Sequence, residues 1–215
     1  MNYLDKKSYE LLYERYLERS PDPLLDAAEL KEGESVLDLC GGSGRLAIAA
    51  RKRGAGIINV VDADINMADE EGLKKHCIDL VNSSVGCFLG QSIVKWDTIF
   101  SQQAVNYWLT RLSATIIHKR LKDGGRFVFN TFHYRPPEDP TFKGYKAANE
   151  DVVAECYYTV GNVVHHFQMR EGCEPHYTSF AWISPDEFMD WLSPTLDVEV
   201  LRPNRNTDIY VCRKK

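Results

Sequence analysis

Long apolar runs are missing from this sequence. No window approaches the roughly 18 consecutive apolar residues of a membrane span, and the first twenty residues are too charged for the apolar core of a secretory signal. These absences predict a chain that stays in the cytoplasm and has no membrane partner. With 215 residues and a hydrophobic share of 44%, the chain can still bury a full core.

Paired cysteines and a basic excess are also missing. The six cysteines show no C-x-x-C spacing, which argues against a zinc site or a disulfide framework. The histidines at 165, 166 and 176 lack helical i, i+4 spacing, so we expect no metal site. A formal net charge of −5 gives no general attraction for nucleic acid, and none is expected as a partner.

The chain does contain a regular alternation of strand and helix patterns. Helices are predicted at 8–20, 20–30, 45–53, 65–80, 110–121 and 184–192. Strands are predicted at 35–39, 56–64, 85–90, 96–102 and 124–132, with a closing pair at 196–203 and 207–215. This series indicates a mostly parallel sheet with helices on both faces.

Three glycines crowd the turn between the first predicted strand and the helix after it. Gly41, Gly42 and Gly44 occupy three of four consecutive positions. Glycine there indicates a backbone with positive φ or a ligand that comes close to the backbone. Because open α/β sheets bind ligands at this edge, the turn predicts a nucleotide-like ligand.

The same glycines fit two classes of nucleotide. Gly42-x-Gly44-x-x-Ala47 matches the dinucleotide fingerprint, so an NAD(P)-dependent oxidoreductase stays an alternative. Asp38 argues against it, because a carboxylate is unfavourable beside a pyrophosphate. A ligand with an ammonium group would be stabilised by the same carboxylate.

The segment Asp38-Leu39-Cys40-Gly41-Gly42-Ser43-Gly44 resembles motif I of class I S-adenosylmethionine-dependent methyltransferases, D/E-x-G-x-G-x-G. The resemblance runs over 34–132, through "VVDAD", "WDTIFSQQAVNYW" and "LKDGGRFVFNTF". Cys40 departs from the motif, since a glycine usually stands there. The resemblance implies a Rossmann-like α/β fold with a seven-stranded, mostly parallel sheet, and S-adenosyl-L-methionine as cofactor.

The resemblance also implies roles for residues along the carboxyl edge of the sheet. Asp38 would neighbour the methionine part of the cofactor, and Asp62 would accept hydrogen bonds from both ribose hydroxyls. Asp64 is the rival of Asp62, although it also fits a helix N-cap. The implied cofactor-binding set further contains Cys40, Gly41, Gly42, Gly44, Ala63 and Gln102 and, for the adenine edge, Gln91 and Ser92.

Methyl transfer depends mainly on alignment of the two reactants, so a dedicated base is not obligatory. The loop 101–108 lacks the Asn/Asp-Pro-Pro-Tyr tetrad of enzymes that methylate adenine or glutamine amides. Gln103, Asn106 and Tyr107 in this loop are candidates for orienting the acceptor, and the alternative is that Tyr107 and Trp108 are packing residues. His133, directly after the fifth parallel strand, is the candidate base, with a plain loop histidine as the alternative.

The segment 133–183 has short β-branched and aromatic runs at 151–160, 162–172 and 174–184. We expect an antiparallel meander inserted after the fifth strand, which resembles the lid of small-molecule methyltransferases. Its aromatic residues would line a pocket for a small-molecule or short-peptide acceptor, although strands favour aromatic residues in any case. These residues are Tyr134, Tyr145, Tyr157, Tyr158, Phe167, Tyr177 and Trp182.

The sequence therefore predicts a single domain over 1–215. It would consist of N-terminal helices (1–33), a cofactor-binding core (34–132), a lid insertion (133–183) and a closing helix with two strands (184–215). The expected function is methyl transfer to nitrogen, oxygen or carboxylate of a metabolite. A catalytically silent S-adenosylmethionine-binding subunit is a further alternative, and the sequence leaves the oligomeric state open, a homodimer included.

Overall fold

The computed structural model describes residues 20–140, 143–146, 152–170, 175–204 and 207–215. The helix predicted at 8–20 lies outside the described residues, apart from its last residue. The chain forms two compact units, one of Pro21–His133 with Pro185–Lys215 and one that contains Tyr134–Ser184. No helix in the described ranges is long and apolar enough to cross a membrane.

The first unit is built on a seven-stranded sheet in the order β10-β11-β5-β4-β1-β2-β3. Strands β1 to β5 pair in parallel, whereas β11 is antiparallel to both β5 and β10. The prediction of a mostly parallel sheet is confirmed. The strands are β1 (Val36–Leu39), β2 (Ile58–Asp62), β3 (Asp79–Asn82), β4 (Trp96–Ser101), β5 (Leu121–Phe132), β10 (Leu196–Asn204) and β11 (Thr207–Lys214).

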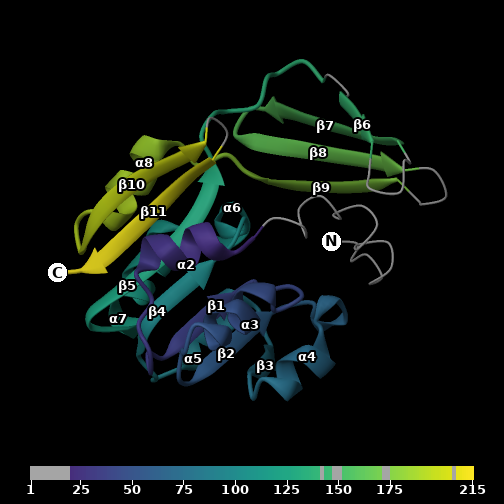
Figure 1. Cartoon of the computed structure of the whole chain (residues 1–215). Coiled ribbons are helices and arrows are strands. Elements are labelled where there is room, and N and C mark those ends of the chain that lie inside the picture. Colours follow the sequence, from purple (N-terminus) through teal and green to yellow (C-terminus); the bar gives the residue numbers. More distant parts are fainter. Residues whose placement is uncertain (1–19, 141–142, 147–151, 171–174, 205–206) are drawn as a thin grey trace. The chain divides into compact units, whose positions relative to one another are not determined.

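Helices cover both faces of this sheet (Figure 1). One face carries α2 and α3, and the other carries α5, α7 and α8. The helices are α2 (Asp22–Ala28), α3 (Arg45–Lys52), α4 (Glu70–Lys75), α5 (Val85–Gln91), α6 (Val105–Trp108), α7 (Arg111–Arg120) and α8 (Pro185–Leu192), with a short 3₁₀ helix η1 (Ile65–Met67).

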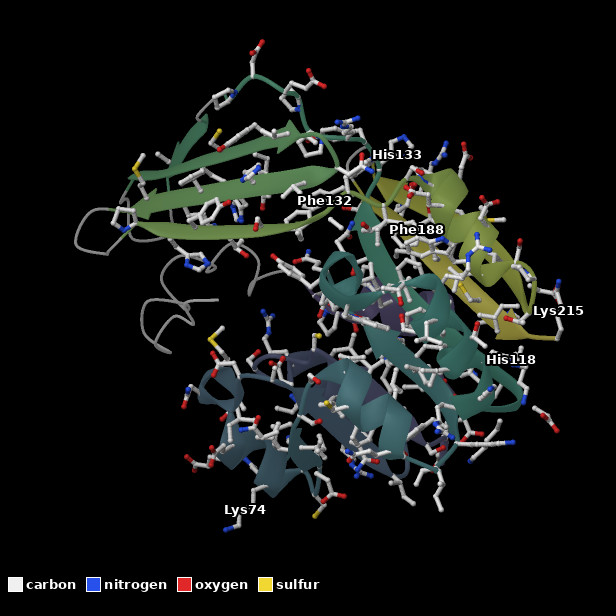
Figure 2. All side chains as sticks on the ribbon, turned by 180° about the vertical axis from the view of Figure 1, so that it is seen from behind. Lys74, His118, Phe132, His133, Phe188 and Lys215 are labelled. Carbon is white, nitrogen blue, oxygen red and sulfur yellow. The ribbon has the colours of Figure 1, made fainter. Side chains whose placement is uncertain are left out.

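The α8 face of the sheet is packed with aromatic rings. Phe188 of α8, labelled in Figure 2, is fully buried against Phe129 and Tyr210, with ring centroids 5.3 and 5.2 Å away. Phe129 and Tyr210 themselves stack at 4.8 Å across β5 and β11. These rings bury a large apolar area and fix α8 on the sheet.

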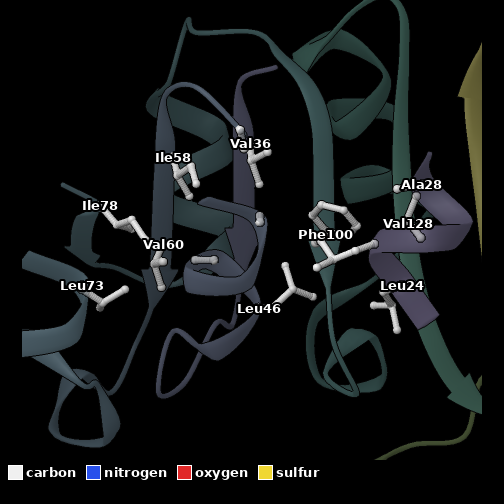
Figure 3. Packing of buried hydrophobic residues seen from close by; sticks show 14 of the residues in the cluster. Leu24, Ala28, Val36, Leu46, Ile58, Val60, Leu73, Ile78, Phe100 and Val128 are labelled. Carbon is white, nitrogen blue, oxygen red and sulfur yellow. The ribbon is translucent and has the colours of Figure 1, made fainter. Parts of the chain in front are cut away.

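The opposite face is filled mainly by aliphatic residues (Figure 3). Leu24 of α2 and Leu46 of α3 pack in one cluster with Val36, Phe100 and Val128 of the central strands. Because both faces are covered, β1 is buried along its whole length and β4 along nearly all of it, with no simple alternation of buried and exposed residues. The result is a rigid sheet whose carboxyl edge is the place where side chains can serve a ligand.

The third parallel strand was predicted in the wrong place. Residues 85–90 form α5, whose N-cap Ser84 accepts a hydrogen bond from the Cys87 amide at 3.3 Å. The strand is β3 (Asp79–Asn82), which overlaps only the last two residues of the predicted helix 65–80. Two physical reasons explain the error. Val85 and Leu89 bury one helical face at i, i+4 spacing, and β3 is a short edge strand with exposed polar ends.

The second unit is a four-stranded antiparallel sheet in the order β6-β7-β8-β9. Its strands are β6 (Lys143–Lys146), β7 (Val152–Val160), β8 (Val163–Arg170) and β9 (His176–Ala181). The hairpin between β7 and β8 turns at Gly161, where φ is +57°. The predicted meander is confirmed, and β6 is an additional strand that the sequence pattern did not reveal.

A buried ion pair links the segment just before β1 to β5. Both terminal guanidinium nitrogens of Arg126 donate to Glu34, at 3.1 and 2.6 Å, and Arg126 is 5% exposed. We expect Glu34→Gln to lower the free energy of unfolding by about 3 kcal/mol, because a buried guanidinium loses its counter-charge. Asp26→Asn, which alters the exposed Arg53 pair, should cost less than about 1 kcal/mol. Chemical denaturation measures both, and equal losses would contradict this account.

Candidate functional site

The carboxyl edge of the seven-stranded sheet has a topological switch point at β1. Strand β1 pairs with β2 on one side and with β4 on the other, so the chain leaves β1 and β4 in opposite directions along the sheet. Open α/β sheets bind ligands in the crevice beyond such a point. The turn after β1 and the ends of β2, β4 and β5 therefore frame the candidate site.

The turn after β1 depends on positive φ angles at alternate positions. Cys40, Gly42 and Gly44 have φ values of 56°, 53° and 79°. A Cβ atom on Gly44 would lie 2.5 Å from Leu73 Cδ2, and one on Gly41 would lie 2.6 Å from Val60 Cγ1. The positive φ angles therefore disfavour a side chain at Gly42 and Gly44, and close packing leaves no space for one at Gly41 and Gly44.

Cys40 adopts a backbone conformation that glycine would take more easily. A left-handed conformation costs a residue with a Cβ atom roughly 1–2 kcal/mol. Burial raises the pKa of the Cys40 thiol to about 12, helped by the charges of Asp62 and Asp38. The thiol is therefore neutral at physiological pH and supplies no thiolate nucleophile.

Asp38 is a buried carboxylate without a hydrogen-bond partner among the described residues. It is 1% exposed, and neither side-chain oxygen forms a hydrogen bond with them. Burial raises the pKa of Asp38 to about 7, and the negative charge of Asp62 raises it further. The nearby Ala47 amide lowers this pKa, although it forms no hydrogen bond with the carboxylate. Such a group favours a cationic ligand and disfavours a pyrophosphate.

Asp62, at the end of β2, closes the turn from the other side. Its Oδ2 accepts a hydrogen bond from the Gly42 amide at 2.8 Å, and its Oδ1 accepts one from the Asp64 amide at 2.9 Å. Each carboxylate oxygen can accept a second hydrogen bond, so the half-buried side chain can still bind two hydroxyls.

Asp64 has a different role in the structure. Its Oδ1 accepts the Asn66 amide at 3.1 Å, which makes it the N-cap of η1, and it is 8% exposed. This is the alternative that the sequence left open for Asp64. Ala63, between the two acids, is exposed.

The loop after β4 is bound to the end of β5. The Gln103 amide donates to Asn130 Oδ1 at 2.8 Å, and Thr131 Oγ1 donates to Asn106 Oδ1 at 2.6 Å. Asn106 is buried, whereas Tyr107 is 43% exposed and Gln102 is half-buried. The structure therefore brings the predicted residues of this loop to the edge, with Asn106 as a link between loop and strand.

His133 forms a dyad with an acid that the sequence analysis did not single out. Its Nδ1 lies 3.1 Å from Oδ2 of Asp208 on β11, and Asp208 is 1% exposed. Asp208 also lies 3.3 Å from Nε of Arg202 on β10. His133 follows Phe132 at the tip of β5 (Figure 2) and its side chain is 34% exposed. The one sequence signal was an acid in the apolar run "TDIYVC".

Gln91 and Ser92 are not brought to this edge. They lie at the C-terminal end of α5, where the chain turns toward the start of β4. Arg120, just before β5, bonds to the Leu89 carbonyl at 3.1 Å, which places this end of α5 at the amino edge of the sheet. Their predicted role rested on a strand at 85–90. Ser83, whose amide donates to the Asp62 carbonyl, is at the correct edge.

The two faces of the second sheet differ in chemistry. On one face, Tyr158 stacks on His165 with ring centroids 4.8 Å apart, and Phe167 packs on Tyr177 at 4.6 Å. On the other, His166 lies 2.9 Å from Glu155 and both are buried. Of the other predicted aromatic residues, Tyr134 is 49% exposed and the side chain of Tyr145 lies outside the described ones.

No protein-family model matches the chain. A ribosomal protein L11 methyltransferase of Macrococcus caseolyticus is 35% identical over 75 residues, which span 34% of this chain and about a quarter (24%) of that relative's length. The structure superposes on an S-adenosylmethionine-bound amino pentose methyltransferase of Micromonospora echinaspora with a TM-score of 0.73, at 14% identity and over 98% of this chain and 99% of that one. A sugar N-methyltransferase of a Streptoalloteichus species gives 0.66 at 12% identity, over 100% and 96%.

This chain has the class I methyltransferase fold. The predicted seven-stranded Rossmann-like sheet with an inserted antiparallel meander is confirmed. In the described part of the chain, no three side chains of His, Cys, Asp or Glu gather to form a metal site.

The pKa of Asp38 gives a testable pH dependence of stability. Since folding raises this pKa from 3.8 to about 7, the protonated carboxyl favours the folded state at low pH, and this contribution is lost as pH rises through about 7. The unfolding free energy of the ligand-free protein should fall between pH 5 and 8, by at most about 1.4 kcal/mol per pH unit from this group.

Asp38→Asn should flatten that part of the stability curve. Denaturation at several pH values measures the slope, and the exposed Asp186→Asn variant is the control for loss of one acid. Identical slopes in the Asp38→Asn and wild-type proteins would show that Asp38 titrates normally.

Proposed function

We propose that this protein is an S-adenosylmethionine-dependent methyltransferase that acts on a small-molecule acceptor. The unpartnered, buried carboxylate of Asp38 beneath the glycine turn carries this proposal, because it demands a cationic group at that position. The methionine part of S-adenosylmethionine has an ammonium group, whereas a dinucleotide would bring a pyrophosphate. The residues present therefore fit this cofactor better than NAD(P).

Different residues around the turn are proposed to contact different parts of the cofactor. Asp38 faces the ammonium group, directly or through a water, while Gly42 and Gly44 leave space for the rest of the cofactor. Asp62 holds the ribose hydroxyls with the free acceptor capacity of its two oxygens. We assign the adenine contact to the segment after β3 that begins with Ser83, in place of Gln91 and Ser92.

S-adenosylmethionine, when bound, supplies a methyl group activated by a positively charged sulfur. The protein has to hold the acceptor in line with that methyl group and to keep water away. The loop with Gln102, Asn106 and Tyr107 is fixed to β5 by its hydrogen bonds, so it offers a rigid border for the acceptor. Asp38 and Asp62 also favour a positively charged cofactor over its neutral-sulfur product.

The acceptor is proposed to be a small polar molecule, with an amino sugar as the leading candidate. Two proteins of the same fold are described as an amino pentose methyltransferase and a sugar N-methyltransferase. The second sheet offers the aromatic and imidazole groups that bind sugar-like molecules. The name of the sequence relative, which points to a protein substrate, is weaker support for the acceptor class, because the match spans about a quarter (24%) of that relative.

Calorimetric titration separates this function from the oxidoreductase alternative. The protein should bind S-adenosylhomocysteine, the product form of the cofactor, with micromolar or better affinity and should show no comparable heat with NADH. Binding of NADH without S-adenosylhomocysteine would overturn the proposal. Binding without methyl transfer to any amine or hydroxyl acceptor would instead indicate a silent subunit.

Asp62 and Asp64 can be distinguished by the same titration. We expect Asp62→Ala to weaken S-adenosylhomocysteine binding by about 2–3 kcal/mol, because two charge-assisted hydrogen bonds are lost. Asp64→Ala, the matched control, removes a helix cap and should change the affinity by less than about threefold. The reverse ranking would show that Asp64 holds the ribose.

The second sheet is proposed to bind the acceptor and not the cofactor. Tyr134→Ala, Tyr158→Ala and Trp182→Ala should raise the KM for an amino sugar or lower kcat, while S-adenosylhomocysteine affinity stays within about threefold. Steady-state kinetics and calorimetry measure the two effects. Parallel loss of cofactor affinity and folding stability in all three variants would identify these aromatics as packing residues.

A further inference from the structure

We propose that Asp208 is a positioning residue that holds His133 as the base for a protonated amine acceptor. This inference rests on the proposed function and deepens it. The pair is formed by two residues that are far apart in sequence, on the last strand and at the tip of β5. No described residue bonds to the second ring nitrogen of His133, Nε2.

The geometry fixes the tautomer of the imidazole. A carboxylate can only accept a hydrogen bond, so Nδ1 of His133 carries the proton that faces Asp208 Oδ2 at 3.1 Å. Nε2 is then left with a lone pair on a side chain that is 34% exposed. The ring is thus oriented to accept a proton at Nε2.

Asp208 is held firmly enough to position the ring. It is 1% exposed on a strand paired on both sides, with Thr131 directly opposite on β5. Arg202 Nε lies 3.3 Å from its other oxygen, Oδ1, and brings a positive charge beside it, although Oδ1 forms no hydrogen bond with a described residue. Tyr210 on β11 is a further titratable group near Asp208, and burial, followed by the charge of Asp208, raises its pKa to about 12; Cys212 on β11 and Asp186 on α8 also raise it.

The strand register places this dyad farther along the strands than Asp38, at the carboxyl edge of the sheet. Asp38 is level with Phe100, and Phe100 is level with Val128 of β5. His133 lies five residues beyond Val128, which corresponds to about 16 Å along a strand. This separation leaves room for the cofactor above Asp38 and places His133 beyond it.

The chemistry favours an ammonium group over a hydroxyl as the proton donor. Imidazoles titrate about four pH units below alkylammonium ions but about nine units below water. Proton transfer to an imidazole is thus about 10⁵-fold more favourable from an ammonium ion. In the proposed step, an N–H bond breaks and its proton moves to Nε2. The nitrogen lone pair then bonds to the methyl carbon as the carbon–sulfur bond breaks, leaving its electron pair on sulfur.

The tautomer can be measured without knowing the natural acceptor. In ¹⁵N-histidine spectra, assigned with His133→Gln, neutral His133 should have a protonated Nδ1 and an unprotonated Nε2. In Asp208→Asn the amide can donate to Nδ1, so the other tautomer should become dominant. An Nε2–H tautomer in the wild-type protein would overturn the inference.

Turnover tests the role in catalysis, with an amino pentose as the acceptor probe and the matching pentose as the hydroxyl control. Asp208→Asn and His133→Gln should lower kcat about 100-fold and change the dependence of kcat on pH. Asp208→Glu should restore part of the rate, and the exposed Asp186→Asn should behave as wild type. Methylation of the pentose in place of the amine would overturn the assigned acceptor class.

The failure of this inference can be distinguished from the failure of the proposed function. Calorimetry with S-adenosylhomocysteine shows whether each variant is folded and binds, and affinities should agree within about threefold. Wild-type turnover with an unchanged rate and pH profile in Asp208→Asn would refute the dyad alone. No binding of S-adenosylhomocysteine by the wild-type protein would refute the proposed function and this inference together.

Discussion

The parallel pairing of β1 with both β2 and β4 is the constraint on which the candidate site depends. It brings Asp38 and Asp62 to one edge of the sheet, where the glycine turn closes over Asp38 and its Gly42 amide donates a hydrogen bond to Asp62. The aliphatic and aromatic layers on the two faces hold this sheet rigid. A buried carboxylate can therefore remain without a partner, because the fold and not the carboxylate provides the stability.

The polar side chains along the carboxyl edge differ in whether they already form hydrogen bonds with the protein. Asp62, Asn106 and Asn130 already accept hydrogen bonds from the protein and are pre-oriented. Asp38 has no partner among the described residues, so part of the free energy of ligand binding goes into satisfying it. This division suits a cofactor that must be held tightly by its charged end and released after it has lost its positive sulfur.

Local sequence signals predicted the first half of the sheet and its turn. The run of glycines after an apolar strand, with Asp38 before it and Asp62 at the next strand end, predicted a ligand site at this edge of the sheet. The prediction of the third strand failed because β3 is short and has polar ends. The apolar residues that follow it fit the spacing of a helix as well as that of a strand. The adenine contact predicted for Gln91 and Ser92 depended on the strand predicted at 85–90 and is therefore also wrong. The contact of Asp208 with His133 could not be predicted from local sequence. It arises because β11 pairs antiparallel with β5, which brings together two residues 75 positions apart.

The central claim is that Asp38 is an unpartnered carboxylate that a cationic ligand completes. Carboxyl ¹³C NMR of protein labelled at aspartate, with Asp38→Asn for assignment, tests it most directly. In the free protein this carboxyl should titrate with a pKa near 7, and with saturating S-adenosylhomocysteine the pKa should fall well below that value because the ammonium group favours the ionised form. The same titration curve in the free and bound protein would contradict the account.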